Sequence, residues 1–313
     1  MKRGMRLAGG RRPPRFDSER RRVAAMGLKG IFSGLFGGTK RVDLWKRFEK
    51  LRESNSGTMS AFYKVRDRQD GATKGLKIID REKAAPIEGR YKGLGKPSEG
   101  EIGLQINGPN IVTTLEWGES TTGDPFVLQE FVEGTLLHNL IYAKVKKPLP
   151  PEQRLDLVRQ AARAIAEVHK AGFVHRDICP RNFMLRDDGQ IVLFDFGLTV
   201  PDKPVFLQPG NRIGTPNYMA PEVVRRRQSD RRIDVFSFGV TAYELCTLES
   251  PWPRGTTGNV AMSHDTPPTP IEQHWHEIPP DLAQGIMACL AAEPAKRPET
   301  MERFLASILK AKA

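Results

Sequence analysis

The stretch Val174-His175-Arg176-Asp177-Ile178-Cys179-Pro180-Arg181-Asn182 is followed, thirteen residues after Asn182, by Asp195-Phe196-Gly197. Together the two segments bring two carboxylates and one side-chain amide into a defined spacing. Such groups are needed to align an acceptor hydroxyl and to hold magnesium against the phosphates of a nucleotide. The spacing therefore predicts phosphoryl-transfer chemistry.

The charge of the chain is concentrated near its N-terminus. The 313 residues are 39% hydrophobic, which is enough for one large domain or two small ones. The formal net charge is +12, but residues 1–52 hold 16 Lys and Arg against 4 Asp and Glu, and residues 53–313 hold 33 of each sign. The basic charge is not spread over a folded face, so a nucleic-acid partner is not expected.

The cysteines and the hydropathy pattern indicate a cytoplasmic protein. Cys179, Cys246 and Cys289 are widely separated and odd in number, so they predict neither a disulfide framework nor a zinc site. No apolar run approaches the roughly 20 residues that span a bilayer. The basic start also lacks the long apolar core of a secretory signal.

Residues 1–42 are expected to form a basic tail rich in glycine and proline. Within it, residues 27–37 carry apolar residues at helical spacing: Leu28, Ile31, Phe32, Leu35 and Phe36. Each glycine in this stretch costs about 1 kcal/mol in a helix relative to alanine, so a helix needs a supporting surface. Two interpretations are open: a segment that is docked or mobile, and an interfacial helix on an anionic membrane.

Short strands dominate the first part of the remaining chain and helices dominate the second. Residues 61–65 and 75–79 flank a turn at Asp70-Gly71 and predict a hairpin. A Gly/Pro-rich connection over residues 84–98 and a short helical pattern follow. Further strands are expected around 111–115 and 126–131, and helices over 151–170, 233–248 and 281–290.

Several further motifs occur in a specific order along the chain. They are Gly75-Leu76-Lys77, His175-Arg176-Asp177 with Asn182, Asp195-Phe196-Gly197, the segment 214–222, Asp234-Val235-Phe236-Ser237-Phe238-Gly239, and Arg297-Pro298. One of these motifs alone would be weak evidence, but the ordered set is specific. Over about residues 48–310 the chain resembles the eukaryotic-type protein kinase family, and its tail and partly degenerate motifs are typical of the bacterial branch.

The resemblance implies an α+β fold with two lobes, a small antiparallel β-sheet lobe and a larger, mainly helical lobe. It also implies a buried ion pair between Glu222 and Arg297 that ties the activation segment to the helical lobe. The expected parts are a tail over 1–42 and a kinase domain over 43–311, with an N-lobe over 43–133 and a C-lobe over 134–311.

The resemblance also implies roles for four catalytic residues. Asp177 would align the acceptor hydroxyl as the base, and Asn182 and Asp195 would hold the metal ions. Lys77 would reach the α- and β-phosphates of the nucleotide. The implied cofactors are ATP and Mg²⁺.

Lys77 needs a carboxylate partner from the first helix of the N-lobe. Glu99 occupies that place if no gap separates it from the segment 108–112. Glu101 occupies it if the helix is two residues short. The residues alone leave both alternatives open.

The loop expected to cover the phosphates departs from the family pattern. Asn55, Gly57 and Ser60 stand where three glycines are usual, with Phe62 in place of a valine. Gly57 keeps the tight bend, so backbone N–H groups can still approach phosphate. We expect nucleotide binding to be weakened rather than abolished, with Gly75 contributing from the lysine motif.

The remaining nucleotide-binding residues are also taken from the resemblance. The segment Glu130-Phe131-Val132 is similar to the hinge between the lobes, whose backbone would meet the adenine. Gln129 would guard the back of the pocket. Val132 and Met184 complete the expected adenine-binding residues.

Cys179 is a departure within the catalytic loop. Serine/threonine-specific members of the family usually carry a lysine there, two residues after the aspartate, and a thiol cannot supply its charge. Two interpretations are open: a small neutral filler and a redox-sensing thiol.

The segment Gly214-Thr215-Pro216 indicates the substrate class. It resembles the serine/threonine-kinase pattern, in which the threonine hydroxyl bonds the catalytic aspartate, so protein substrates with Ser or Thr acceptors are expected. Arg176 would ordinarily clamp a phosphorylated residue of the activation segment. Between Thr199 and Thr215, however, there is no Ser, Thr or Tyr.

The hypothesis is a serine/threonine protein kinase that uses Mg-ATP. One alternative is a pseudokinase-like scaffold, which the altered phosphate loop and Cys179 favour and the retention of the four catalytic residues disfavours. The other is a small-molecule kinase, which the segment 214–222 disfavours because such enzymes lack this platform for protein substrates.

Overall fold

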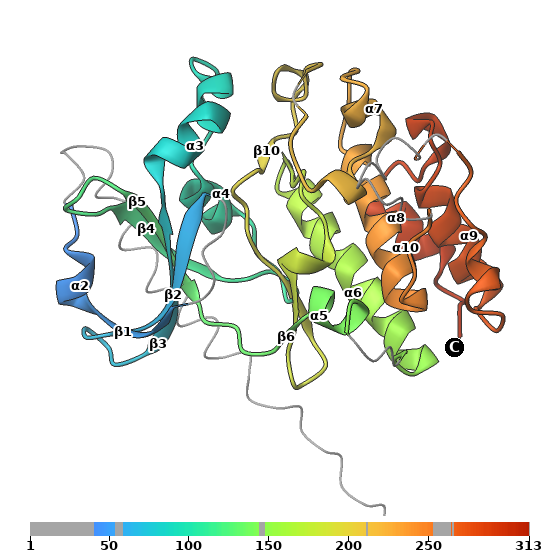
Figure 1. The fold of residues 1–313 in the computed structure, drawn as a ribbon, viewed down its shortest axis with the longest axis horizontal. Helices are drawn as coiled ribbons and strands as arrows, with labels where there is room; N and C mark the ends of the chain where they lie inside the picture. Colours follow the sequence, from blue (N-terminus) through green and yellow to red (C-terminus); the bar gives the residue numbers. More distant parts are fainter. Residues whose placement is uncertain are drawn as a thin grey trace, which may run out of the picture. The chain divides into compact units, whose positions relative to one another are not determined.

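The sheet of the smaller lobe is built around the hairpin that the sequence predicts. Strands β2 (Ser60–Asp67) and β3 (Thr73–Ile79) pair antiparallel around Asp70-Gly71, which confirms that prediction. In the computed structural model the strand order is β1-β2-β3-β5-β4, and every neighbouring pair is antiparallel (Figure 1). The other strands are β1 (Phe48–Glu53), β4 (Thr114–Glu119) and β5 (Pro125–Glu130).

The structure describes residues 41–53, 59–143, 148–210, 212–252, 264 and 266–312. The predicted amphipathic segment 27–37 lies outside these residues, as do Asn55 and Gly57. Residues 42–313 form one compact unit. In the described part of the chain, no helix is both long enough and apolar enough to cross a bilayer.

Short helices lie next to the sheet. Asp43 caps α2 (Leu44–Arg47), and Asp80 caps α3 (Arg81–Glu88), which leads into the 3-10 turn η2 (Gly89–Tyr91). Helix α4 (Glu99–Gln105) follows and packs on β4. The apolar side chains between the strands form the core of this lobe: Leu44, Phe48, Val65, Leu76, Phe126 and Leu128.

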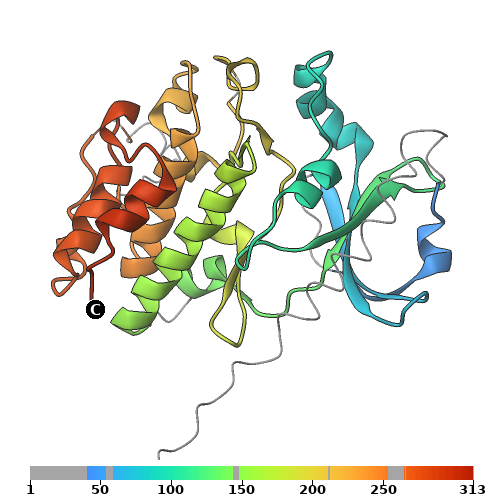
Figure 2. The ribbon, with the colours of Figure 1, turned by 180° about the vertical axis from the view of Figure 1, so that it is seen from behind.

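The larger lobe is mainly helical (Figures 1 and 2). Its long helices are α6 (Pro151–Lys170), α8 (Arg232–Thr247) and α9 (Pro280–Cys289). The shorter ones are α5 (Leu137–Ile141), α7 (Pro221–Val224) and α10 (Met301–Ser307), with 3-10 turns η3 (Pro180–Asn182), η4 (Pro204–Phe206), η5 (Pro216–Tyr218), η7 (Ile271–Gln273) and η8 (Pro294–Lys296). Its strands are β6 (Thr135–Leu136), β7 (Phe173–Val174), β8 (Phe183–Leu185), β9 (Ile191–Leu193) and β10 (Val200–Pro201).

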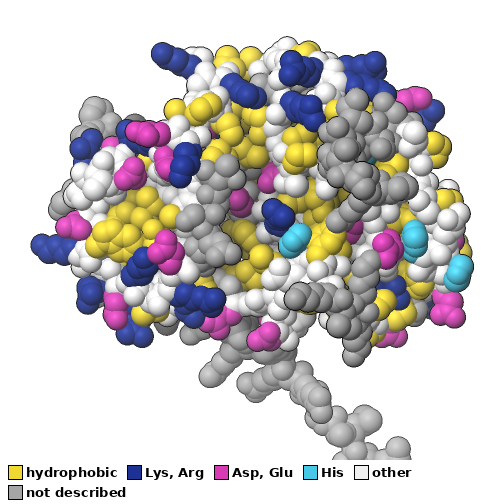
Figure 3. Space-filling model, in the orientation of Figure 1, with side chains coloured by type: hydrophobic (Ala, Val, Ile, Leu, Met, Phe, Trp, Pro, Cys, Tyr) yellow, Lys and Arg dark blue, Asp and Glu magenta, His cyan; other side chains and the backbone are white. Residues whose placement is uncertain are grey.

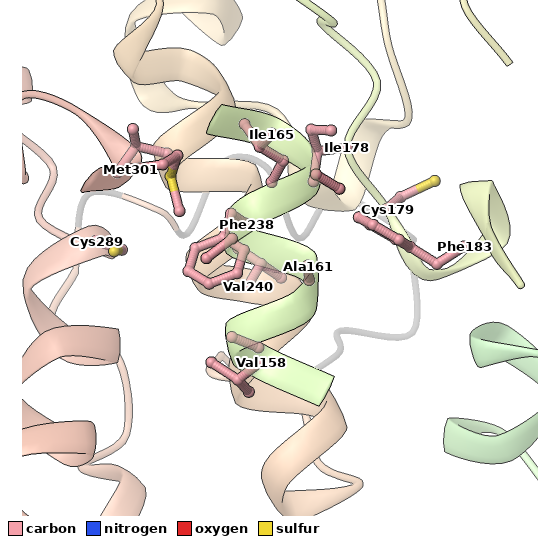
Figure 4. Packing of buried hydrophobic residues seen from close by; sticks show 14 of the residues in the cluster. Val158, Ala161, Ile165, Ile178, Cys179, Phe183, Phe238, Val240, Cys289 and Met301 are labelled. Atoms are coloured by element: carbon pink, nitrogen blue, oxygen red, sulfur yellow. The ribbon is translucent and has the colours of Figure 1, made fainter. Parts of the chain in front are cut away.

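The core of the larger lobe forms between α6 and α8. The stripe of α6 that contains Val158, Ala161 and Ile165 faces Phe238 and Val240 of α8 (Figure 4). Helix α8 is buried along nearly its whole length, because other helices cover it on several sides. A rigid helical base of this kind can position the loops that leave it.

Two predictions from the sequence need correction. The strand expected around 111–115 exists but begins later, since β4 starts at Thr114, and Ile111 makes only an isolated β-bridge with Leu193. Ile111 and Val112 pack in the core of the larger lobe, and Val112 N donates to the carbonyl of Leu193 at 2.9 Å. The connection expected over 84–98 contains most of α3. The prolines and glycines of this stretch disfavour a helix, so the sequence pattern did not predict one there.

Candidate active site

Three charged side chains from separate elements meet between the two lobes. Lys77 of β3 places its Nζ 2.6 Å from Oε1 of Glu99 and 2.7 Å from Oδ1 of Asp195. The side chains of Lys77 and Glu99 are 11% and 10% exposed, whereas Asp195 is 44% exposed. Acidic side chains lie among hydrophobic ones in the recess at the middle of the face in Figure 3.

The charges of this cluster shift one another's protonation equilibria. Burial by itself lowers the pKa of Lys77, but the carboxylates of Asp195 and Glu99 outweigh burial and raise it above the usual range. Burial raises the pKa of Glu99, and the charge of Lys77 only partly offsets that effect. Lys77 therefore stays charged at neutral pH, as contact with phosphate oxygens requires.

Packing of α4 decides which glutamate faces Lys77. A Cβ on Gly100 would lie 2.2 Å from Cβ of Trp117, and one on Gly103 would lie 2.3 Å from Oγ1 of Thr114. The two glycines thus let α4 approach β4 closely, and this approach directs Glu99 toward β3.

Glu101, the alternative partner, points elsewhere. Its Oε2 accepts hydrogen bonds from N and Oγ of Ser98 at 2.7 and 2.8 Å, which closes a capping box at the start of α4. The capping pattern Ser98-x-x-Glu101 was visible in the sequence and could have decided the question. Glu101 therefore does not pair with Lys77, and the alternative that places it in the nucleotide site is wrong.

Asp177 is held from two sides, by Thr215 and by Asn182. Oδ1 of Asp177 accepts hydrogen bonds from N and Oγ1 of Thr215 at 2.8 and 2.7 Å. Nδ2 of Asn182 donates to the carbonyl and to Oδ2 of Asp177 at 2.7 and 3.0 Å. The amide nitrogen of Asn182 is thereby used within the loop, which leaves its oxygen available as a ligand.

A buried carboxylate supports this loop from below. Asp234 of α8 accepts hydrogen bonds from N of His175 at 2.7 Å, N of Arg176 at 2.8 Å and Nε2 of His169 at 3.0 Å. This supporting role of Asp234 was not predicted from the sequence. A carboxylate within the buried, apolar α8 was the signal that could have identified one.

Backbone strain is concentrated at the same site. Arg176 and Asp195 adopt φ values of +71° and +67°, which residues with a Cβ rarely do. Gly214 has φ +120°, and a Cβ there would lie 2.6 Å from the carbonyl of Arg176. Strained conformations cost about 1–3 kcal/mol each and persist where the surrounding structure imposes them.

The end of the activation segment is tied to the larger lobe. Both Nη atoms of Arg297 donate to the carboxylate of Glu222, at 2.7 and 2.8 Å, and both residues are buried. The ion pair expected from the resemblance is confirmed. It fixes α7, and therefore the segment that carries Thr215.

The structure describes most of the residues expected to bind the nucleotide. They lie on one side of the sheet and at the junction of the two lobes. In the β2–β3 ladder, Ser60 pairs with Ile79 and Phe62 pairs with Lys77. The ring of Phe62 covers Gly75, where a Cβ would lie 2.6 Å from Cζ of the ring.

The hinge residues lie where β5 ends. Gln129 pairs with Gly75 in the ladder, and N of Glu130 donates to the carbonyl of Thr113 at 2.9 Å. The carboxylate of Glu130 also pairs with Arg186 at 3.0 Å. Val132 and Met184 are both half-buried.

Cys179 lies beside Asp177, and its thiol is not activated for reaction. Its side chain is buried, and its Sγ is 3.7 Å from Oγ1 of Thr215. Burial, together with the negative charge of Asp177, raises the pKa of the thiol to about 12. Because thiolates are the reactive form, the structure favours the neutral-filler interpretation over the redox sensor.

Comparison with known proteins agrees with this geometry. Residues 48–308 match the family described as protein kinase domain. The chain is 30% identical over 218 residues to the serine/threonine-protein kinase PknB of Mycobacterium leprae, an alignment that covers 68% of this chain and 35% of that protein. It is 32% identical over 222 residues to the serine/threonine-protein kinase pkn3 of Myxococcus xanthus, covering 67% and 40%, and 28% identical over 266 residues to PrkC of Bacillus subtilis, covering 84% and 40%.

The alignments therefore span about a third to two fifths of the length of these curated relatives. The family match covers most of the present chain, and the two lobes described above have the arrangement that the family implies. On this evidence of sequence and fold, the chain belongs to the protein kinase family and has its bilobal α+β fold.

Proposed function

We propose that the chain is a serine/threonine protein kinase, which transfers the γ-phosphoryl group of Mg-ATP to Ser and Thr hydroxyls of protein substrates. The observation that carries the proposal is the joint arrangement of the site. Lys77 is paired with Glu99, while Asp177 is held by Thr215 and Asn182. The names of the relatives, all serine/threonine-protein kinases, support the same reaction.

The donor atoms of the site fit a magnesium ion. Asp195 and Asn182 offer a carboxylate and an amide oxygen, which are the ligands that Mg²⁺ prefers. Among the described residues there is no cluster of three or more His, Cys, Asp or Glu side chains that could hold a metal ion. Mg²⁺ bound to nucleotides needs only one or two carboxylates, because the phosphates supply further oxygens. When bound, the ion would neutralise charge on the phosphate oxygens.

The residues of the chain then have distinct tasks in the proposed reaction. Lys77 would hold the α- and β-phosphates, and Asp177 would orient the acceptor hydroxyl in line with the γ-phosphorus. The bond from the γ-phosphorus to the β–γ bridging oxygen breaks, and a bond to the acceptor oxygen forms. The proton of the hydroxyl passes to Asp177.

The alternatives find less support in the geometry. A scaffold without chemistry would not need Lys77, Glu99, Asp177 and Asn182 in these mutual contacts. A small-molecule kinase would not need Thr215 bonded to Asp177 as part of a platform for protein substrates. Asn55 and Gly57 lie outside the described residues, so the weakened phosphate loop stays a prediction.

The test is phosphate transfer from labelled ATP to a generic protein substrate, with identification of the phosphorylated residue. Asp195→Asn should reduce turnover by more than tenfold, about 1.4 kcal/mol in the barrier, with an unchanged thermal midpoint. Asp187→Asn, which removes an exposed carboxylate from the turn between β8 and β9, is the matched control. Retention of more than a tenth of the activity by Asp195→Asn would contradict the metal role, and phosphotyrosine as the product would contradict the substrate class.

We propose in addition that the basic tail binds anionic membranes. This proposal is supported by the sequence alone, because residues 1–40 lie outside the described residues. Each basic residue near an anionic surface contributes about 1 kcal/mol of attraction. The full-length protein should co-sediment with anionic vesicles at low salt, bind less at high salt, and not bind neutral vesicles. A failure to bind anionic vesicles at low salt would rule out the contact.

A further inference from the structure

The inference concerns Tyr91, the last residue of η2, which the proposed mechanism does not use. Nη1 of Arg176 donates a hydrogen bond to the hydroxyl of Tyr91, although the two residues are 85 positions apart in the sequence. Arg176 and Tyr91 are 8% and 4% exposed. A buried guanidinium without acceptors would be costly, so this hydroxyl contributes to keeping Arg176 in place.

Tyr91 also contacts the activation segment. Its ring centroid is 5.9 Å from that of Phe206 in η4, and both rings belong to one buried hydrophobic cluster. Tyr91 is therefore a point where the connection between α3 and α4 contacts both Arg176 of the loop before Asp177 and Phe206 of η4.

Beyond Tyr91 the chain leads directly to Glu99. Nζ of Lys96 lies 5.9 Å from the ring centroid of Tyr91 and pairs with Glu88 at 3.0 Å. The side chain of Lys96 is almost completely buried, and α4 begins three residues later. An anchor at Tyr91 consequently restrains the segment that presents Glu99 to Lys77.

On the other side, Arg176 leads directly to Asp177. The Arg176 backbone is fixed by its hydrogen bond to Asp234 and by its positive φ, and its carbonyl lies against Gly214. Because Tyr91 holds the side chain of Arg176, it also restrains the backbone next to Asp177, the proposed base. The contact joins the two halves of the site, Lys77–Glu99 and Asp177–Thr215.

Residues 200–214 contain no Ser, Thr or Tyr, so a phosphate cannot form there to occupy Arg176. We infer that Tyr91 is a positioning residue whose hydroxyl restrains Arg176 permanently, in place of a phosphorylated side chain of the activation segment. The inference rests on the proposed kinase function and adds its mode of regulation. The enzyme is held in its working arrangement by a neutral hydrogen bond that needs no modification.

The experiment compares the full-length wild type with Tyr91→Phe, which keeps the ring against Phe206 and removes only the hydroxyl. We expect kcat to fall about tenfold. KM for ATP should stay within about twofold, because the hydrogen bond to Arg176 acts next to Asp177, which is proposed to orient the acceptor hydroxyl rather than to bind the nucleotide. Tyr63→Phe removes a phenol hydroxyl from β2, where the ring packs against Trp45, and should behave as wild type. A wild-type kcat for Tyr91→Phe would overturn the inference.

The second arm is a double-mutant cycle with Arg176→Met. If Tyr91 acts through Arg176, adding Tyr91→Phe to Arg176→Met should lower kcat by less than about twofold further. Fully additive losses would show that Tyr91 acts by another route and would overturn the inference. If Tyr91→Phe does not fold, Arg176→Lys probes the same contact, since lysine keeps the charge but loses the planar group.

The same four proteins are also compared by chemical denaturation, which tests the Tyr91–Arg176 contact without an activity assay and so separates the inference from the proposed function. The two changes should be non-additive in the unfolding equilibrium constant by more than about fivefold, a readout that requires no activity. If the wild type is inactive but the two changes are non-additive in unfolding, the contact between Tyr91 and Arg176 is confirmed. The kinase proposal, and with it the role of Tyr91 in regulation, would then be overturned. An active wild type with additive unfolding effects would overturn only the role of Tyr91.

Discussion

The assignment of Glu99 as the partner of Lys77 can be tested with two glutamates of one helix. Glu99→Gln and Glu101→Gln make the same chemical change, two residues apart on α4. In the first, Nζ of Lys77 loses a charged acceptor at 2.6 Å in a site where both side chains are about nine-tenths buried. A hydrogen bond to a charged group contributes about 1.5–3 kcal/mol, which corresponds to a loss of about 10- to 150-fold in kcat/KM.

The loss should be catalytic rather than structural. Asp195 still pairs with Lys77 after Glu99→Gln, so no buried charge is left without a partner, and a neutral side chain is easier to bury. We therefore expect the thermal midpoint to change little. Because Asp195 would then be the main carboxylate on Lys77, the Mg²⁺ concentration needed for half-maximal activity should rise. The assay is steady-state transfer from ATP at several Mg²⁺ concentrations.

Glu101→Gln serves as the matched control. A glutamine can still accept the hydrogen bond from N of Ser98, so the capping box is kept and activity should stay within about twofold of wild type. The reasoning would be refuted if Glu99→Gln kept more than half of the wild-type kcat/KM. An equal loss in both variants would also refute it, because the effect would then belong to the helix as a whole.

Three further outcomes are expected. Phosphatase treatment of the purified protein should leave its rate unchanged, because residues 200–214 offer no hydroxyl, and a large loss measured by phosphate transfer would contradict this. At pH 8 the folded protein should resist alkylation at Cys179, because burial raises the pKa of this thiol to about 12, whereas the unfolded protein should react. Prompt labelling of Cys179 in the folded protein, located by peptide mapping, would disprove the filler interpretation. Arg297→Met should lower the free energy of unfolding by about 3–5 kcal/mol, because it leaves Glu222 buried and charged without a partner. The measurement is a denaturant titration, and a loss below about 1 kcal/mol would show that the ion pair contributes little to stability.

Much of the fold was predictable because it depends on local patterns. The apolar stripe of residues 151–170 predicted α6 with its observed bounds, and alternation around Asp70-Gly71 predicted the β2–β3 hairpin. The catalytic loop was predictable for a different reason. Asp177 and Asn182 are five residues apart, so their mutual contact lies within the loop, although Asp234 and Thr215 hold the loop from distant parts of the chain.

Features that depend on contacts between distant segments could not be predicted in this way. The partner of Lys77 depends on how closely Gly100 and Gly103 let α4 approach β4. The apolar residues at 111–112 looked like a strand because burial in a helical core and burial in a sheet need the same side chains.

The contact between Tyr91 and Arg176 illustrates the limit most clearly. Neither residue has a sequence neighbour that indicates the other. The two meet where Tyr91 of η2 packs against Phe206 of η4 and where Asp234 holds the backbone of Arg176. Local sequence constrains backbone angles and which face of an element is buried. Which buried polar groups then meet is decided by tertiary packing, because a hydrogen bond needs its donor and acceptor within about 3 Å of each other.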